Sequence, residues 1–336
     1  MTHPLPDGFT SRPATTDDAA CVATLWNDRS NTTRGERPST PGLVLKTWDH
    51  PKFDLSTDSR LVFAPDEMLI GYAHVRDVKD PPVDVFSGRS VHPDYNDAEW
   101  LWDDLFSWME AEARRVIPKA PEDARIALVA GTWKQDLTDQ RELERHGFEH
   151  NRTFHRMQID FVPPPEEAPW PDGIHVRTVV PGEDDIELVT AYLEAFADHY
   201  GIIQQPFETE LQEWRNLMQE NDFDPSLWFL ATDTVEGGAV AGLCICHPKA
   251  REDPERGQIN DLGVRPAWRR RGIGRALLLH AFSELASRGI QGAALTVDTE
   301  NKSGAPALYG RVGMRPIQAS HTYVKELRPG VNLVPQ

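Results

Sequence analysis

The sequence predicts an α/β fold with a mixed sheet, in which one α/β unit occurs twice in tandem. A proline-rich segment at 161–173 divides the 336 residues almost in half, and the same kinds of element follow one another in each half. Three pairs of landmarks are separated by 171, 173 and 166 residues: Gly71 and Gly242, Val91 and Val264, Gly147 and Gly313. A nearly constant offset indicates two copies of one unit.

The dividing segment, FVPPPEEAPWPDG, contains five prolines and has no periodicity. Proline lacks the backbone donor that helices and central strands need, so neither element can continue through it. We therefore expect a first domain at 1–160, a linker at 161–173 and a second domain at 174–336.

Each half is predicted to contain a helix, a hairpin, a strand ending in Val-x-Pro, a long amphipathic helix, a strand and a short helix with a glycine near its end. In the first half these lie at 19–30, 61–78 with a turn at Pro65-Asp66, around Val91, at 98–116, at 125–131 and at 143–148. In the second half they lie at 186–200, 226–248 with a turn at Gly237-Gly238, 259–264, 274–289, 292–297 and 308–314. The second amphipathic helix should bury Ile273, Leu277, Leu278, Ala281 and Leu285.

The composition describes an ordinary globular chain with a net charge of −18. This charge disfavours nucleic acid and anionic membranes as partners, because both bind clustered basic residues. No apolar run reaches the roughly 18 residues of a membrane span, and no signal peptide is recognisable. We expect a cytoplasmic protein, either a monomer or a homodimer.

The three cysteines are too few for a disulfide framework. Cys244 and Cys246 are two apart in a predicted strand, so their side chains should share one face. Their spacing with His247 matches no standard zinc pattern, and we interpret them as buried thiols and expect no metal.

The strongest candidate for a ligand site is the stretch VRPAWRRRGIGRAL, from Val264 to Leu277. Here a strand leads through a basic turn into a helix, whose first backbone amides would face an anion such as a pyrophosphate. Gly272 and Gly274 would allow close approach, and positive charge comes from Arg269, Arg270, Arg271 and Arg275. A basic helix start without a ligand is one alternative. A dinucleotide-binding turn is another, but it would place Gly-x-Gly-x-x-Gly directly after the strand.

The stretch Arg269-Arg270-Arg271-Gly272-Ile273-Gly274 resembles the coenzyme A signature of the GNAT superfamily of N-acetyltransferases, Arg/Gln-x-x-Gly-x-Gly/Ala. The second signature of that superfamily is matched by DTENKSGAPALYGRVGM, which includes Asn301 and Tyr309. The resemblance covers 174–327, and the first half is similar to the same fold more faintly. The tandem architecture is similar to that of mycothiol synthase, although Gln258 leaves that particular substrate unsupported.

The resemblance implies an enzyme that moves an acetyl group from acetyl-CoA to a primary amine of a small molecule. It implies that the backbone of Leu262, Gly263 and Val264 pairs with the pantetheine arm. The amides from Arg270 through Arg275 to Ala276 would hold the pyrophosphate, and Asn301 would bind near the pantetheine. Tyr309 would protonate the leaving thiolate, unless it is only a packed aromatic residue.

The residue that would accept the proton of the amine differs from the family pattern. Several relatives have a glutamate six residues before the Val264 position, where this chain has Gln258. Asp261 is the nearest carboxylate, and we interpret it as the base or the amine anchor, the alternative being a carboxylate on the opposite face of the sheet. The acceptor should contact the loop after the first helix of this half, through His199 and Tyr200. Phe207 and Trp214 could belong to the same wall or to the core.

The first copy is a poor site for coenzyme A. Where the second copy has its arginines and glycines, the first has Asn96-Asp97-Ala98-Glu99-Trp100, and Leu143 stands at the position of Tyr309. Two carboxylates there would repel a pyrophosphate. We expect a degenerate domain without coenzyme A. The alternative for the whole protein is a sensor that binds acyl-CoA without turning it over.

Overall fold

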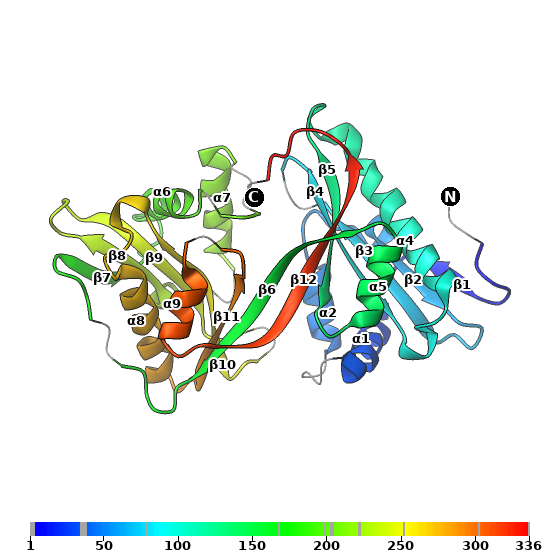
Figure 1. Cartoon of the computed structure of the whole chain (residues 1–336), viewed down its shortest axis with the longest axis horizontal. Coiled ribbons are helices and arrows are strands. Elements are labelled where there is room, and N and C mark those ends of the chain that lie inside the picture. Colours follow the sequence, from blue (N-terminus) through cyan, green and yellow to red (C-terminus); the bar gives the residue numbers. More distant parts are fainter. Residues whose placement is uncertain are drawn as a thin grey trace. The chain divides into compact units, whose positions relative to one another are not determined.

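The computed structural model describes residues 4–33, 39–77, 80–166, 169–197, 199–201, 205–220, 223–250, 253–301 and 303–334 (Figure 1). The chain forms two compact units. Unit 1 comprises 1–153 and 320–333, and unit 2 comprises 154–319 and 334–336. Each unit is described by itself below.

Unit 1 contains a sheet with the strand order β1-β2-β3-β4-β5-β12. All neighbours are antiparallel except β4 and β5, which are parallel. Its elements are β1 (Thr10–Arg12), α1 (Ala19–Thr33), α2 (Pro41–Trp48), α3 (Leu55–Asp58), β2 (Ser59–Phe63), β3 (Leu69–Arg76), β4 (Asp84–Val91), α4 (Glu99–Ala113), β5 (Ile126–Trp133), α5 (Leu137–Arg145) and part of β12 (Arg315–Arg328).

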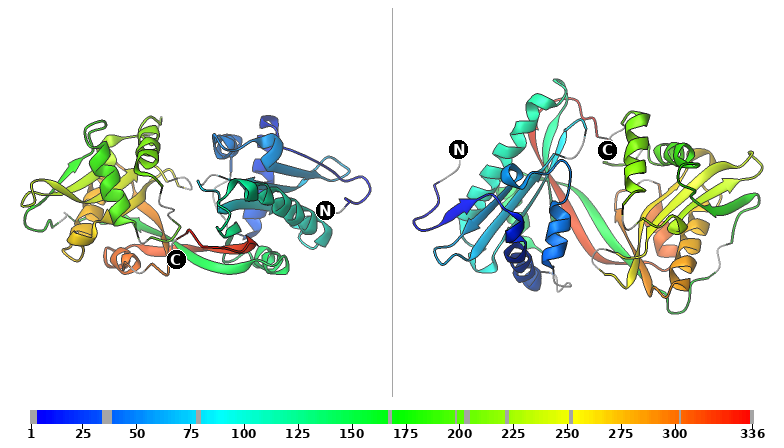
Figure 2. Two further views of the ribbon diagram at one scale, coloured as in Figure 1. Left: turned by 90° about the horizontal axis from the view of Figure 1, so that it is seen from above. Right: turned by 180° about the vertical axis from the view of Figure 1, so that it is seen from behind.

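Helices cover both faces of this sheet, as the two further views show (Figure 2). On one face α4 buries Leu101, Leu105 and Met109 against the strands. On the other face α1 and α2 pack their apolar residues, Val22 and Val44 among them, against the sheet. The alternation of apolar residues along the strands supplies both cores.

Unit 2 has the corresponding order β6-β11-β10-β9-β8-β7, in which only β10 and β11 are parallel. Its elements are part of β6 (Glu149–Asp160), β7 (Ile174–Thr178), α6 (Asp185–Ala195), α7 (Phe207–Leu217), β8 (Trp228–Asp233), β9 (Ala239–His247), β10 (Arg256–Val264), α8 (Ile273–Ser287), β11 (Gly292–Asp298) and α9 (Ala305–Arg311). The predicted apolar stripe of α8, from Ile273 to Leu285, is buried.

The register of the strands confirms the internal repeat. Gly71 of β3 pairs with Val91 of β4, and Gly242 of β9 pairs with Val264 of β10. A paired arginine and aspartate also recur: Arg12 with Asp18 in unit 1, and Arg177 with Asp184 in unit 2. The predicted fold class, α/β with a mixed sheet, is therefore confirmed.

One edge strand of each unit's sheet, β12 in unit 1 and β6 in unit 2, was not predicted from the sequence. These two strands change where the chain divides. β12, the final strand of the chain, pairs with β5 of unit 1 over Ser320–Arg328. β6 pairs with β11 of unit 2 over 154–160. Both strands begin in one unit and end in the other, so the compact units divide the chain at other places than the predicted 1–160 and 174–336. The predicted linker connects β6 to β7, and its residues 167–168 lie outside the described residues.

One predicted loop is partly a helix. Phe207 and Trp214 lie on α7, and the Trp214 ring packs edge-on against Trp228 in a buried cluster, so Trp214 belongs to the core and not to an acceptor wall. Within the described part of the chain, no helix combines the length and apolar character that a membrane crossing needs.

Candidate active site

The strands β10 and β11 of unit 2 pair only at their beginnings. Their parallel register joins Arg256–Gln258 to Gly292–Ala294, and β10 then continues to Val264 beside β9 alone. Leu262, Gly263 and Val264 therefore lie where β10 has diverged from β11. A main-chain group that faces the diverging strand can bind a ligand there, although the Val264 carbonyl already accepts from the Arg269 guanidinium.

The turn between β10 and α8 has the conformation that the two signature glycines predict. Gly272 is the N-cap of α8 with φ +89°, and Arg270 also lies in the left-handed region with φ +62°. The first hydrogen bond of α8 runs from the amide of Ala276 to the carbonyl of its N-cap residue, Gly272. The preceding amides have no partner within the helix and lie at its positive end, which suits an anion.

The arginines of this turn were predicted to add positive charge for an anion, but three of them contact other protein groups. The Arg269 guanidinium donates to the carbonyls of Val264 (3.1 Å) and Ala195 (3.0 Å), joining the end of β10 to α6. Arg271 forms an ion pair of 3.1 Å with Asp233. Arg275 lies 3.7 Å from the Glu166 carboxylate. Three of the four guanidinium groups therefore contact other protein atoms, and the backbone amides at the start of α8 are the groups that best suit an anion.

Asp233 anchors the turn. Its carboxylate accepts from the Trp268 indole at 2.9 Å and from Arg271. These hydrogen bonds, Trp268 first, hold the pKa of Asp233 below its ordinary value. Arg271 and Trp268 therefore fix the turn to β8.

Gly274 brings the two signatures together. A Cβ at this position would lie 3.5 Å from the Leu308 side chain of α9 and 3.6 Å from the Val264 side chain of β10. The start of α8 therefore lies against both β10 and α9. Tyr309, the neighbour of Leu308, is buried on α9.

Asn301, which the resemblance places near the pantetheine, lies in the turn between β11 and α9. Its side-chain oxygen accepts hydrogen bonds from the amide of Ser303 (2.8 Å) and from the Ser303 hydroxyl (2.5 Å). This side chain shapes the turn that leads into α9.

Gly263 allows a close approach between β10 and α6. A Cβ there would lie 2.8 Å from the Phe196 ring and 2.9 Å from the Cβ of Ala195. Real side-chain atoms do not approach so closely, so only glycine fits without movement of α6. The Phe196 ring also lies 5.6 Å from the His199 ring.

Two groups have the titration behaviour that proton transfer needs. Asp261 pairs with Ile245 on the face of the sheet that packs against α6 and α7, and burial raises its pKa from 3.8 to about 6. Burial also raises the pKa of the Tyr309 hydroxyl, and Cys244 and Asp261 raise it further. Asp261 is therefore a carboxylate at neutral pH, whereas Tyr309 keeps its proton.

Gln258, which replaces the glutamate of several relatives, lies near a basic residue that the sequence did not reveal. Arg156 of β6 donates to the Gln258 side-chain oxygen at 2.7 Å. The Gln258 amide nitrogen donates to the carbonyl of Ile259. Sequence reasoning missed Arg156 because β6 carries no motif and was not predicted as a strand of this unit.

The predicted acceptor residues lie close to the end of α6. His199 Nδ1 lies 3.0 Å from the carbonyl oxygen of Tyr200, and the Tyr200 ring is 6.5 Å from the ring of Phe154 on β6. Residues 198 and 202–204 of the same loop lie outside the described residues. The structure thus brings His199 near Phe196 and Tyr200 near Phe154, on the two sides of the β10–β11 divergence.

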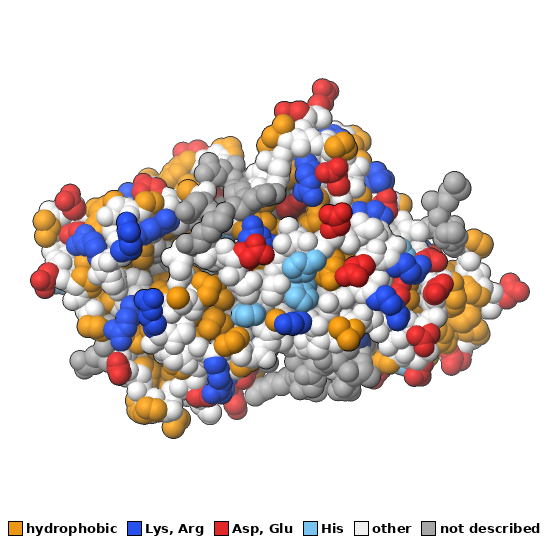
Figure 3. All heavy atoms as spheres, in the orientation of Figure 1, with side chains coloured by type: hydrophobic (Ala, Val, Ile, Leu, Met, Phe, Trp, Pro, Cys, Tyr) orange, Lys and Arg blue, Asp and Glu red, His pale blue; other side chains and the backbone are white. Residues whose placement is uncertain are grey.

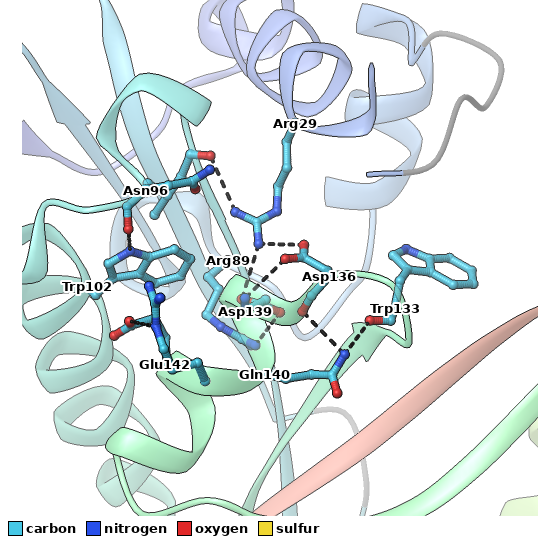
Figure 4. Close-up of polar contacts among 11 residues, drawn as sticks. Arg29, Arg89, Asn96, Trp102, Trp133, Asp136, Asp139, Gln140 and Glu142 are labelled. Carbon is cyan, nitrogen blue, oxygen red and sulfur yellow. Dashed lines mark hydrogen bonds and ion pairs between the residues drawn. The ribbon is translucent and has the colours of Figure 1, made fainter. Parts of the chain in front are cut away.

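The same place in unit 1 is filled by buried ion pairs (Figure 4). Arg89 of β4 lies 2.6 Å from Asp139 of α5, and Arg29 of α1 lies 2.7 Å from Asp136 and 3.4 Å from Asp139. Arg29 also donates to the carbonyl of Val91, the counterpart of Val264. The α4 N-terminus has Ala98 as its N-cap and Glu99 in its first turn.

Two of the cysteines lie side by side on β9. Cys244 and Cys246 are buried with their sulfur atoms 3.6 Å apart, on one face of β9 as predicted, and both are free thiols. In the described part of the chain, no group of three or more His, Cys, Asp and Glu side chains could hold a metal ion.

Comparison with known sequences connects this geometry to a family. The model of the acetyltransferase (GNAT) family matches residues 189–314. The mycothiol acetyltransferase of Streptomyces scabiei (strain 87.22) is 32% identical over 269 residues, which cover 79% of this chain and 79% of the relative. That of Streptomyces bingchenggensis (strain BCW-1) is 33% identical over 179 residues, 52% of this chain and 55% of the relative.

Solved structures share the whole architecture. A GCN5-related N-acetyltransferase from Sphaerobacter thermophilus is 32% identical, with a TM-score of 0.84 over 98% of this chain and 99% of that one. A tandem GNAT protein from the clavulanic acid biosynthesis pathway has a TM-score of 0.71 at 14% identity, over 96% of this chain and 100% of that one. At that identity the second likeness shows the fold alone.

Proposed function

This chain belongs to the GNAT family of acetyltransferases, which move an acetyl group from acetyl-CoA to an amine, and on this premise we propose that unit 2 acetylates a primary amine of a small molecule. The observation that carries the proposal is the convergence of three features at the end of β10: the α8 amides, Asp261 and Tyr309. The comparisons give no support to the alternative, a sensor that binds acyl-CoA without turnover.

We assign the binding of acetyl-CoA to backbone groups. The amides between Arg270 and Ala276, at the positive end of α8, suit the pyrophosphate. The main chain of Leu262–Val264, where β10 has diverged from β11, suits the pantetheine arm. Asn301 shapes the turn between β11 and α9. The left-handed Arg270 and Gly272 support this fit, because that backbone turns the amides of the loop toward one anion. When bound, acetyl-CoA supplies the thioester that the amine attacks.

Asp261 is the proposed proton acceptor or anchor for the amine. With a pKa of about 6, it is ionised at neutral pH and attracts an ammonium group, whose proton must leave before attack. Gln258 stands where several relatives have a glutamate, and its amide cannot accept a proton. A different residue must therefore act as the base. A backbone amide near Val264 would stabilise the negative charge that develops on the thioester oxygen.

Tyr309 is the proposed proton donor to the thiolate that leaves. Its hydroxyl is buried beside α8 and keeps its proton because burial and the nearby Cys244 and Asp261 disfavour the phenolate. A protonated phenol at the end of the thioester site is suited to this step. Asp261 of β10 would thus accept the proton of the amine, and Tyr309 of α9 would donate a proton to the thiolate.

The acceptor is proposed to contact His199 and Tyr200. Both lie in the segment that follows α6, whose residue Phe196 packs against Gly263 of β10. The amine that the mycothiol acetyltransferases accept is one candidate, since those relatives are about one-third identical.

We propose that unit 1 does not bind coenzyme A. The ion pairs of Arg29 and Arg89 occupy the space between β4 and β5, and the α4 N-terminus carries Asp97 and Glu99 rather than arginines. The charge of −18 disfavours nucleic acid as a partner. We propose further that the protein is cytoplasmic and acts as a monomer or homodimer.

Release of free thiol from acetyl-CoA tests the enzyme directly. The full chain is incubated with a panel of small primary amines that includes the acceptor of the mycothiol acetyltransferases, and thiol is measured with a chromogenic disulfide. We expect amine-dependent release. If coenzyme A raises the melting temperature while no amine in a broad panel releases thiol, the catalytic proposal is overturned in favour of the sensor.

A further inference from the structure

Two histidines lie next to each other on the neighbouring strands β6 and β12, within unit 1 and outside the proposed active site. His150 belongs to the part of β6 that lies in unit 1, and His321 to the part of β12 that lies there. The Thr322 hydroxyl lies 3.5 Å from the carbonyl oxygen of Arg152, which shows that the strands are adjacent at this level. Histidine side chains are visible on the surface in this orientation (Figure 3).

Three donor atoms form a nearly equilateral triangle here. His150 Nε2 lies 3.2 Å from His321 Nδ1 and 3.2 Å from the Thr153 hydroxyl oxygen. The same oxygen lies 2.9 Å from His321 Nδ1. Ligands that share one face of a metal ion, with bonds of about 2.1 Å, are about 3.0–3.4 Å apart. All three separations fall within or just below that interval.

The ring orientations agree with this spacing. The centroids of the two imidazole rings are 4.9 Å apart, whereas the facing nitrogens are 3.2 Å apart. Rings placed end to end would have more widely separated centroids, so the ring axes are inclined to one another.

We propose that His150 and His321, with Thr153 as a weaker third ligand, bind a divalent transition-metal ion such as Zn²⁺. Imidazole nitrogen is a preferred ligand of zinc, nickel and copper ions. His150 is exposed and His321 is partly buried, so water molecules can complete the coordination sphere. A closed structural zinc site has four protein ligands, whereas two histidines and a hydroxyl leave coordination positions open, so we expect an open site of moderate affinity.

One positive charge near the histidine pair opposes the binding of a cation. Lys134 lies close enough to His321 to act on its ring electrostatically, and the same charge would repel a metal ion. Removing that charge should therefore strengthen binding.

A bound ion would join the two strands that pass between the units. β6 runs from unit 1 into unit 2, and β12 runs from unit 2 back into unit 1. Coordination by one residue from each strand would hold them together inside unit 1. Since an ion that binds only the folded state stabilises it, zinc should raise the melting temperature.

Titration of the metal-free full chain with ZnCl₂ by calorimetry tests the site. We expect one equivalent to bind, and His150→Asn and His321→Asn each to raise Kd at least tenfold. His175→Asn, a change of an exposed histidine on β7 of unit 2, is the matched control and should leave Kd unchanged. Zinc should raise the melting temperature of the unchanged protein and of the control, but not of the two variants.

A second variant keeps the test decisive if the histidine variants fold poorly. Lys134→Gln should lower Kd severalfold, because a like charge near the ion is removed. The proposal is overturned if no stoichiometric zinc binding occurs, or if the ion binds equally well to the histidine variants and to the unchanged protein. Acetyl transfer plays no part in this readout, so failure of the metal site and failure of the proposed function remain distinguishable.

Discussion

The guanidinium of Arg89 lies 2.6 Å from the carboxylate of Asp139, and the exposed fractions of these two side chains are only 1% and 7%. Arg89 comes from β4, the counterpart of β10 in unit 2, and Asp139 from α5, the counterpart of α9. Arg29 lies 3.4 Å from the same carboxylate. Unit 1 thus has the strand order of unit 2, but buried ion pairs connect its α5 to α1 and β4.

Arg89→Met should destabilise unit 1 strongly. The change leaves Asp139 buried with less compensation, and breaking a buried ion pair by removing one partner costs about 3–5 kcal/mol. The free energy of unfolding, measured by urea denaturation, should fall by about that amount. Replacing both partners, as in Arg89→Met with Asp139→Leu, should recover part of the loss, because no unpaired carboxylate remains there. A loss as small as that of an exposed pair, such as Arg125 with Glu326, would contradict this account.

Gly272→Glu should abolish binding of coenzyme A, whereas Ala98→Glu should leave it intact. Gly272 is the N-cap of α8 in the left-handed region, so the change adds strain, bulk and negative charge at the anion site. Ala98 is the N-cap of α4, the equivalent helix of unit 1. Affinity is measured by calorimetry with coenzyme A. Equal loss in both variants would show that unit 1 binds the ligand too.

Much of this arrangement was predictable from local patterns. The turn before α8 follows from Gly272, whose left-handed backbone disfavours other residue types, and the apolar stripe of α8 follows from helical periodicity. The offset between Gly71 and Gly242 reappears as an identical strand register. Such features depend on residues close together in the sequence, or on the same motif occurring twice.

Other features depend on contacts that no local pattern encodes. β12 pairs with β5 some 190 residues earlier in the chain, and nothing in its sequence identifies that partner. Arg156 reaches Gln258 only because β6 pairs with β11. Arg269 was predicted to face a phosphate, but its side chain reaches the carbonyls of Val264 and Ala195, which a signature cannot show.

Asp261→Asn should remove the acidic limb of the pH profile. Burial raises the pKa of Asp261 to about 6, so a base at this position is protonated and inactive below pH 6 and becomes active as the pH rises through 6. In the unchanged protein kcat/KM should therefore rise through about pH 6. The asparagine variant should lose about 10²-fold or more in kcat/KM, the usual contribution of a general base.

The sign of the stability change provides an independent check on Asp261. Because its pKa is raised in the folded state, the carboxyl favours folding in its protonated form, and its contribution is lost as the pH rises from about 4 to about 6. The free energy of unfolding of the Asp261→Asn variant minus that of the unchanged protein should therefore be more positive above pH 6 than at pH 4. If the variant keeps both the pH profile and the rate, Asp261 is neither base nor anchor.

Tyr309→Phe should lower kcat while leaving the affinity for coenzyme A nearly unchanged. The change removes only the hydroxyl, and the ring remains to fill the buried position on α9. If Tyr309 protonates the thiolate, kcat should fall by about 10²-fold, and the loss should be smaller for acyl donors whose thiol is more acidic, since their thiolates leave without a proton. Tyr192→Phe, a change of a partly buried tyrosine of unit 2 whose pKa is also raised mainly by burial, is the matched control. An equal fall in both variants, or no dependence on the acidity of the leaving thiol, would make Tyr309 a packing residue.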